Sequence, residues 1–83
     1  MQHGEPDRLT KREIEILALI GLGLDSRAIA ETLRIAYFTV RKHRSNILYK
    51  LHLNSSAQLS AYAVAYAGAS QAQNRRSSLP GPP

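Results

Sequence analysis

The feature that most constrains this chain is a three-residue interval, 34–36, between two segments with helical apolar spacing. Before it, Asp25 is a good N-cap residue. The segment that Asp25 opens has three apolar residues on one helix face: Ile29, Ala30 and Leu33. After the interval, a longer segment, 37–51, has three apolar residues on one side: Val40, Ile47 and Leu51. Because three residues allow only a tight turn, the pattern predicts a helix-turn-helix.

Two further helical segments flank this pair. Thr10 and Glu13 have the spacing of a capping box at the start of the first segment, and Gly23 is the expected left-handed residue after its end. Asn54 or Ser55 can cap the last segment, which is rich in alanine. We therefore predict an all-α, four-helix domain with helices over about 10–22, 26–33, 37–51 and 56–69.

The length of 83 residues allows one domain. Residues 1–8 have no periodic apolar pattern, and from Ser70 the composition shifts to polar residues, proline and glycine. We expect a disordered lead-in over 1–8, a folded domain over 9–69 and a disordered tail over 70–83. A domain of this size buries a modest core and is rarely a complete enzyme.

Several kinds of chemistry have no support in the residues. There is no cysteine, so disulfides, thiolate metal sites and cysteine nucleophiles are excluded. His43 has no second histidine at metal-ligand spacing, and we expect it to be partly buried and hydrogen-bonded. There is no nucleophile turn, glycine-rich phosphate loop or apolar run long enough for a membrane span. We predict a cytoplasmic protein that is not an enzyme and has no metal, cofactor, membrane partner or small-molecule ligand in this domain.

The distribution of charge indicates a polyanionic partner. The net charge is +5, and all six acidic residues lie in the first 31 positions. Five basic residues follow in an acid-free stretch: Arg34, Arg41, Lys42, Arg44 and Lys50. Composition alone fits two interpretations equally well, a solvated charged helix face and a surface that binds nucleic acid.

The segment 37–51 separates these interpretations because it follows a tight turn, and two of its basic residues, Arg41 and Lys42, lie on the side opposite its apolar residues. We predict that three outward residues read base edges in the DNA major groove: Arg41, Lys42 and Ser45. We expect the DNA backbone to be contacted by residues at the sides and ends of the segment: Tyr37, Phe38, Thr39, Arg44 and Lys50. For the Tyr37–Phe38 pair, the alternative is that a ring packs on a partner.

These residues also match a known family. The motifs are Leu-Thr-x-Arg-Glu from Leu9, Ile-Ala-x-x-Leu from Ile29 and Thr-Val-Arg-x-His-x-x-Asn-Ile-x-x-Lys-Leu from Thr39. Together they resemble the LuxR/FixJ-type (GerE-like) helix-turn-helix domain of bacterial transcription regulators, over about residues 8–68. The resemblance implies an effector domain that follows a receiver or sensor domain, as in response regulators. It also implies a nucleoid-associated protein that binds near-palindromic promoter sites as a dimer, with RNA polymerase as a further candidate partner.

In that family the fourth helix usually forms the dimer contact. The corresponding residues here, which we expect to face outward, are Gln58, Ala61, Tyr62 and Ala65. The chain departs from the family pattern at Ala28, His52 and Ser56, and at Ala36, where the usual cap is Ser or Thr. By the resemblance, Lys50 has either a backbone-contacting or a helix-anchoring role. We interpret the chain as an excised C-terminal domain rather than a stand-alone regulator.

Two alternative functions stay open from the sequence. The first is a promoter-reading domain of a sigma factor, which shares the opening Leu-Thr-x-Arg-Glu motif; a long segment after Leu51 argues against it. The second is a helical protein-interaction module that has lost DNA binding. It is favoured only by the missing cap at Ala36 and the rings of Tyr37 and Phe38.

Overall fold

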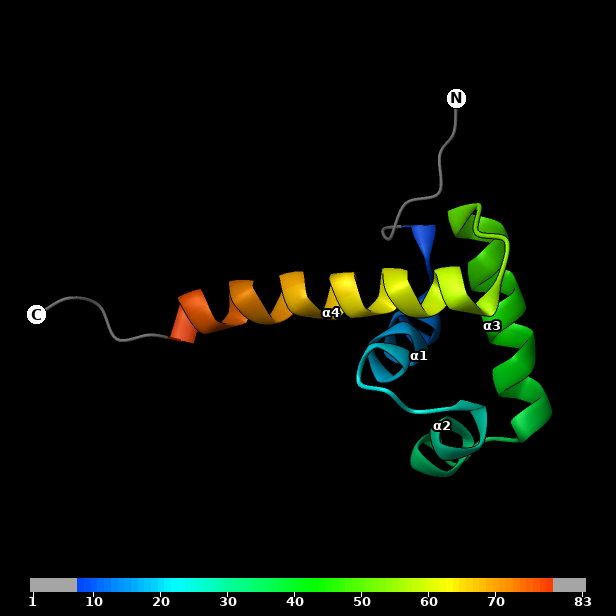
Figure 1. The fold of residues 1–83 in the computed structure, drawn as a ribbon. Coiled ribbons are helices and arrows are strands. Elements are labelled where there is room, and N and C mark those ends of the chain that lie inside the picture. Colours follow the sequence, from blue (N-terminus) through cyan, green and yellow to red (C-terminus); the bar gives the residue numbers. More distant parts are fainter. Residues whose placement is uncertain (1–7, 79–83) are drawn as a thin grey trace, which may run out of the picture.

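The computed structural model describes the backbone of residues 8–78 and the side chains of residues 8–68; the predicted disorder of residues 1–7 and 79–83 lies outside the described residues. Within the described part there are four helices and no strand: α1 (Lys11–Gly21), α2 (Ser26–Leu33), α3 (Tyr37–Leu51) and α4 (Ser56–Ser78). The predicted all-α, four-helix architecture is confirmed. Figure 1 shows α4 lying across α1 and continuing well beyond the other three helices.

The predicted caps of α1 are present. The Thr10 hydroxyl accepts a hydrogen bond from the Glu13 N–H at 3.1 Å, and the Glu13 carboxylate accepts one from the Thr10 N–H at 2.9 Å. This reciprocal pair is a capping box and satisfies two backbone donors at the helix start. Beyond the end of α1, Gly23 has a φ of 96°, a left-handed conformation that glycine adopts without strain.

The turn between α2 and α3 has the predicted length. Asp25 caps α2 through a hydrogen bond from the Ala28 N–H at 2.9 Å. Arg34 then adopts the left-handed conformation, with a φ of 58°, and this reverses the chain after α2. Ala36 begins α3 without a side-chain cap, as the sequence predicted. Because Ala36 leaves an N-terminal donor without that partner, α3 depends on packing of its buried side.

The core lies where the four helices meet. Its six largest fully buried side chains come from all four helices: Ile16, Leu17, Ile29, Val40, Ile47 and Leu59. The most extensive helix contact is between α1 and α4, and α3 packs against both α2 and α1. At Gly21 the backbone of α4 comes so close that a Cβ atom would lie 2.5 Å from the Ala63 carbonyl oxygen. The core therefore fixes the position of α3 relative to α1 and α2.

The fourth helix is longer than the sequence predicted. It begins as expected, because the Ser55 hydroxyl accepts a hydrogen bond from the Gln58 N–H at 3.1 Å. It ends at Ser78 rather than near residue 69. The physical reason is that residues 70–78 contain neither glycine nor proline. The first residue that restricts helix continuation is Pro80, which disfavours the helical conformation of the residue before it.

Candidate nucleic-acid interface

Helix α3 has a buried apolar side and an exposed polar side. Val40, Ile47 and Leu51 are buried in the core. On the opposite side, the three predicted base-reading residues are all exposed: Arg41, Lys42 and Ser45. With Phe38 and Asn46 they line an open hollow of about 460 Å³. The structure thus places these three residues together on one outward surface, which we call the reading face.

An aromatic ring supports one end of the reading face. The Arg27 guanidinium carbon lies 5.0 Å from the centroid of the Tyr37 ring, and that of Arg41 lies 5.9 Å from it. Both distances are within the range of cation–π attraction. The Tyr37 ring therefore contacts two guanidinium groups, that of Arg27 from α2 and that of Arg41 from α3. The contribution of Arg27 was missed in the sequence, because it depends on how α2 packs against α3.

The other residues predicted to contact the DNA backbone differ in exposure. Phe38 is 73% exposed, whereas Thr39 and Arg44 are half-buried. The Arg44 guanidinium lies 3.5 Å from the Ser56 hydroxyl, at the junction of α3 and α4. Thr39 and Arg44 therefore lie to the sides of the reading face, where a helix seated in the groove would meet phosphates.

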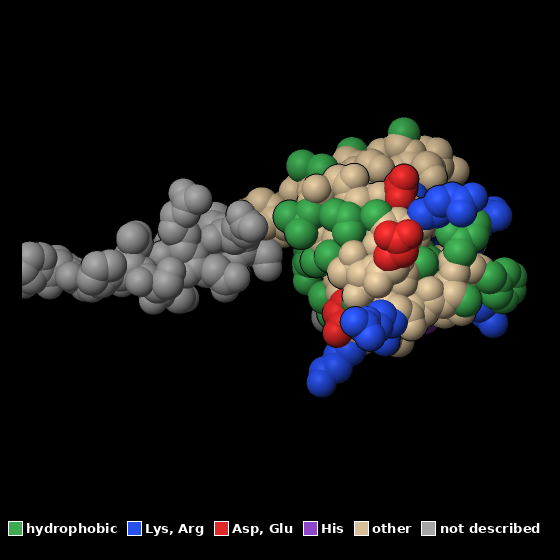
Figure 2. All heavy atoms as spheres, turned by 90° about the horizontal axis from the view of Figure 1, so that it is seen from below, with side chains coloured by type: hydrophobic (Ala, Val, Ile, Leu, Met, Phe, Trp, Pro, Cys, Tyr) green, Lys and Arg blue, Asp and Glu red, His purple; other side chains and the backbone are tan. Residues whose placement is uncertain are grey.

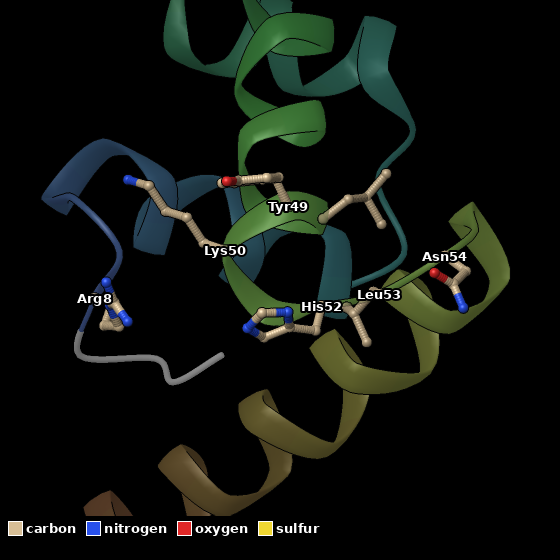
Figure 3. Close-up of a pocket in the computed structure, with 7 residues that line it drawn as sticks. Arg8, Tyr49, Lys50, His52, Leu53 and Asn54 are labelled. Atoms are coloured by element: carbon tan, nitrogen blue, oxygen red, sulfur yellow. The ribbon is translucent and has the colours of Figure 1, made fainter. Parts of the chain in front are cut away.

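Lys50 differs from the other basic residues of α3 because its ammonium group forms an ion pair with a buried carboxylate. It lies 2.8 Å from the Glu13 carboxylate, whose side chain is only 4% exposed. Figure 3 shows Lys50 extending from α3 toward the start of α1. Of the two roles expected for Lys50, the structure thus supports helix anchoring. The ion pair joins α3 to the capping box of α1.

The same carboxylate carries the clearest electrostatic effect in the domain. Burial alone would raise the pKa of Glu13, but hydrogen bonds from Lys50 and from the Thr10 N–H oppose it, as do the charges of Lys50 and His43. The net result is a pKa below its ordinary value of 4.5. Glu13 is therefore ionised at neutral pH and serves as a fixed negative charge under the end of α3.

His43 is half-buried on the core side of α3, as expected. Its Nδ1 atom is buried, and it has no hydrogen-bond partner among the residues that the structure describes. His43 is therefore partly buried as expected, but its Nδ1 atom does not make a hydrogen bond within the described residues. Within the described part of the chain, no group of three His, Cys, Asp or Glu side chains could hold a metal ion, and no helix is long and apolar enough to cross a membrane.

The predicted dimer contact on α4 is only partly exposed. Gln58, Ala61 and Ala65 face outward, and Val64 between them is 58% exposed. Tyr62 is instead half-buried against the core, so its expected outward position is wrong. The reason is that Tyr62 lies one turn from Leu59, which is fully buried against the other helices. Burial and the neighbouring Tyr66 raise the pKa of Tyr62.

The surface near α2 and α3 combines basic and apolar side chains. Figure 2 shows hydrophobic side chains among Lys and Arg side chains at the α3 end of the molecule. A short capped helix, a tight turn and a helix with one buried and one basic side define a helix-turn-helix DNA-binding domain. The class of protein therefore follows from the fold together with the reading face.

Comparison with known proteins identifies the family. The model for bacterial regulatory proteins of the luxR family matches residues 7–63, and the chain belongs to that family. It is 48% identical over 58 residues to the transcriptional regulatory protein LnrK of Bacillus subtilis (strain 168), covering 70% of this chain. It is 45% identical over 56 residues to the oxygen regulatory protein NreC of Staphylococcus carnosus (strain TM300), covering 68% of this chain. The chain spans 26% of the length of each relative.

Proposed function

We propose that this domain binds specific double-stranded DNA sequences by inserting α3 into the major groove. In this proposal Arg41, Lys42 and Ser45 hydrogen-bond to base edges, while Thr39 and Arg44 contact phosphates. The observation that carries the proposal is the reading face, since its three polar residues are exposed together on the side of α3 opposite the core. Membership of a family of regulators supports the same conclusion.

We also propose that the domain acts as a dimer on near-palindromic promoter sites. The support is the outward face of α4, where Ala61, Val64 and Ala65 leave apolar surface exposed near the core. Small side chains allow two helices to approach closely. A two-fold axis along this face would place two copies of α3 on half-sites about one helical turn apart.

The context of the whole regulator is part of the proposal. The matched relatives are regulatory proteins by name, and the aligned 56–58 residues make up only 26% of the length of each relative. We propose that a receiver or sensor domain precedes the domain, as in response regulators. RNA polymerase is the expected further partner, and the expected location is the cytoplasm, at the nucleoid. The proposed role is not enzymatic.

Selection of bound sites from random duplex DNA tests the function. The expected result is one enriched motif that occurs as two inverted copies. Binding to the motif should fall steeply as salt rises, because contacts to phosphates release counterions. A helical protein-interaction module, the alternative that the exposed Phe38 ring favours, would enrich no sequence and show no salt-sensitive DNA binding.

A further inference from the structure

Phe38 occupies a position that neither the fold nor the ion pairs of the domain explain. It lies in the first turn of α3, its side chain is 73% exposed, and it is outside the core. Arg41, Lys42 and Ser45 follow it at i+3, i+4 and i+7, so the four residues form one stripe along the helix. All four line the same hollow. The ring therefore lies next to the reading face, in the same hollow.

The chemistry of the ring limits what it can recognise. Phenylalanine has no donor or acceptor, so it cannot hydrogen-bond to a phosphate or to a polar base edge. The apolar group that duplex DNA presents in the major groove is the C5-methyl of thymine, and phenylalanine is among the side chains that contact it. Residues at the start of a recognition helix are the ones that reach base edges.

We infer that Phe38 is a fourth base-reading residue, which selects thymine through its C5-methyl group. The inference rests on the proposed function, and it replaces the DNA-backbone contact expected for Phe38 from the sequence. A high exposure would not by itself distinguish Phe38 from the other exposed rings of α3. Tyr49 is more exposed, at 84%, but it lies near the other end of α3 and lines a different pocket, with residues such as His52 (Figure 3).

Tyr37, the neighbour of Phe38, is not an equivalent candidate. Its ring is contacted by the guanidinium groups of Arg27 and Arg41, and it is 42% exposed. The polar reading residues can identify guanine or adenine through donors and acceptors, whereas a methyl contact needs an apolar surface. Among the residues that line the hollow, only Phe38 offers a large apolar side chain.

The test uses the full chain and the duplex that it selects from random DNA. Each thymine is replaced in turn by deoxyuridine, which removes only the methyl group. The expected result is one thymine in each half-site whose replacement weakens binding about fourfold, corresponding to about 0.8 kcal/mol for one buried methyl-sized group. Phe38→Ala should bind the thymine and deoxyuridine duplexes equally. Tyr49→Ala, the matched aromatic control on the same helix, should keep the fourfold difference.

Two results would overturn the inference while leaving the proposed function intact. The parent could bind its selected duplex yet be indifferent to every thymine replacement, or Phe38→Ala could keep the same methyl dependence. If the parent selects no sequence at all, the proposed function fails and the inference falls with it. Because Phe38 is outside the core, Phe38→Ala should unfold at the same temperature as the parent. The deoxyuridine scan of the parent does not depend on any variant, so it tests the inference even if Phe38→Ala fails to fold.

Discussion

Replacing Lys50 with methionine tests how α3 is attached to the rest of the domain. Methionine keeps an apolar chain of similar length but removes the ammonium group that lies 2.8 Å from Glu13. The carboxylate, whose side chain is 4% exposed, would then keep only the hydrogen bond from the Thr10 N–H. We expect Lys50→Met to lower the free energy of unfolding because it leaves a buried charge without its counterion.

The size of the loss follows from the exposure of the two partners. Removing one partner of a fully buried pair costs about 3–5 kcal/mol, whereas an exposed pair contributes about 0–1 kcal/mol. The Lys50 side chain is 32% exposed, so water can reach part of the site. We therefore expect a loss of about 2–3 kcal/mol. The matched control is Arg12→Met, which removes the exposed ion pair to Glu15 and should cost less than about 1 kcal/mol.

The pH dependence of this loss identifies its source. Because the folded-state pKa of Glu13 is lowered, its ionisation stabilises the parent above about pH 4.5, and this stabilisation is lost as the pH falls through the folded-state value. In Lys50→Met the raising effect of burial loses its main opposition, so the pKa of Glu13 rises. We therefore expect the difference in the free energy of unfolding between parent and variant to become smaller from neutral pH to about pH 3. Urea unfolding followed by circular dichroism measures this difference. A difference in the free energy of unfolding that stays constant with pH, or that is absent at neutral pH, would refute the reasoning.

Three further predictions concern packing, capping and assembly. Gly21→Ala should lower the free energy of unfolding by about 1–3 kcal/mol in a urea titration, because its Cβ would meet the Ala63 carbonyl oxygen in α4; unchanged stability would contradict this close approach. Ala36→Ser should add about 1 kcal/mol by supplying the missing cap of α3, again measured by urea unfolding, and a loss would show that the turn cannot accept a cap. Val64→Asp should leave folding intact and abolish two-copy binding to a palindromic duplex in sedimentation measurements, whereas retained two-copy binding would exclude this face as the dimer contact.

Local chemistry made most of the fold predictable. The capping box at Thr10 and Glu13, the cap at Asp25 and the left-handed Gly23 each depend on residues within four positions of one another. The buried side of α3 also followed from helical spacing, since one face carries Val40 and its apolar partners. Spacing along one helix defines which residues share a face, so the predicted base-reading residues emerged together.

Contacts between distant segments were not predictable in the same way. Glu13 has the sequence signature of a capping residue, and nothing near it indicates a partner 37 positions away in Lys50. The inward turn of Tyr62 was missed because α4 is rich in alanine and lacks a strong apolar stripe. Arg27 reaches Tyr37 only through the packing of α2 on α3. Each of these features depends on the relative placement of helices, which spacing along the chain does not encode.

The role of Lys50 in DNA binding can be separated from its role in folding. If the residue only anchors α3, Lys50→Met should bind the selected duplex with nearly the parent salt dependence at a temperature where both proteins are folded. A direct phosphate contact would instead reduce the salt slope by about one.

The most direct test of the central claim compares Arg41→Ala with Arg44→Ala on two duplexes, the selected site and a scrambled one, at fixed salt. The parent should prefer the selected duplex by about 10³-fold or more. Arg41→Ala should lose about 1–3 kcal/mol on the selected duplex alone, because it removes a contact to a base edge. Arg44→Ala should weaken binding to both duplexes equally, because it removes a phosphate contact. Equal losses on both duplexes for Arg41→Ala, or a parent with no preference between them, would contradict the assignment of α3 as the helix that reads DNA.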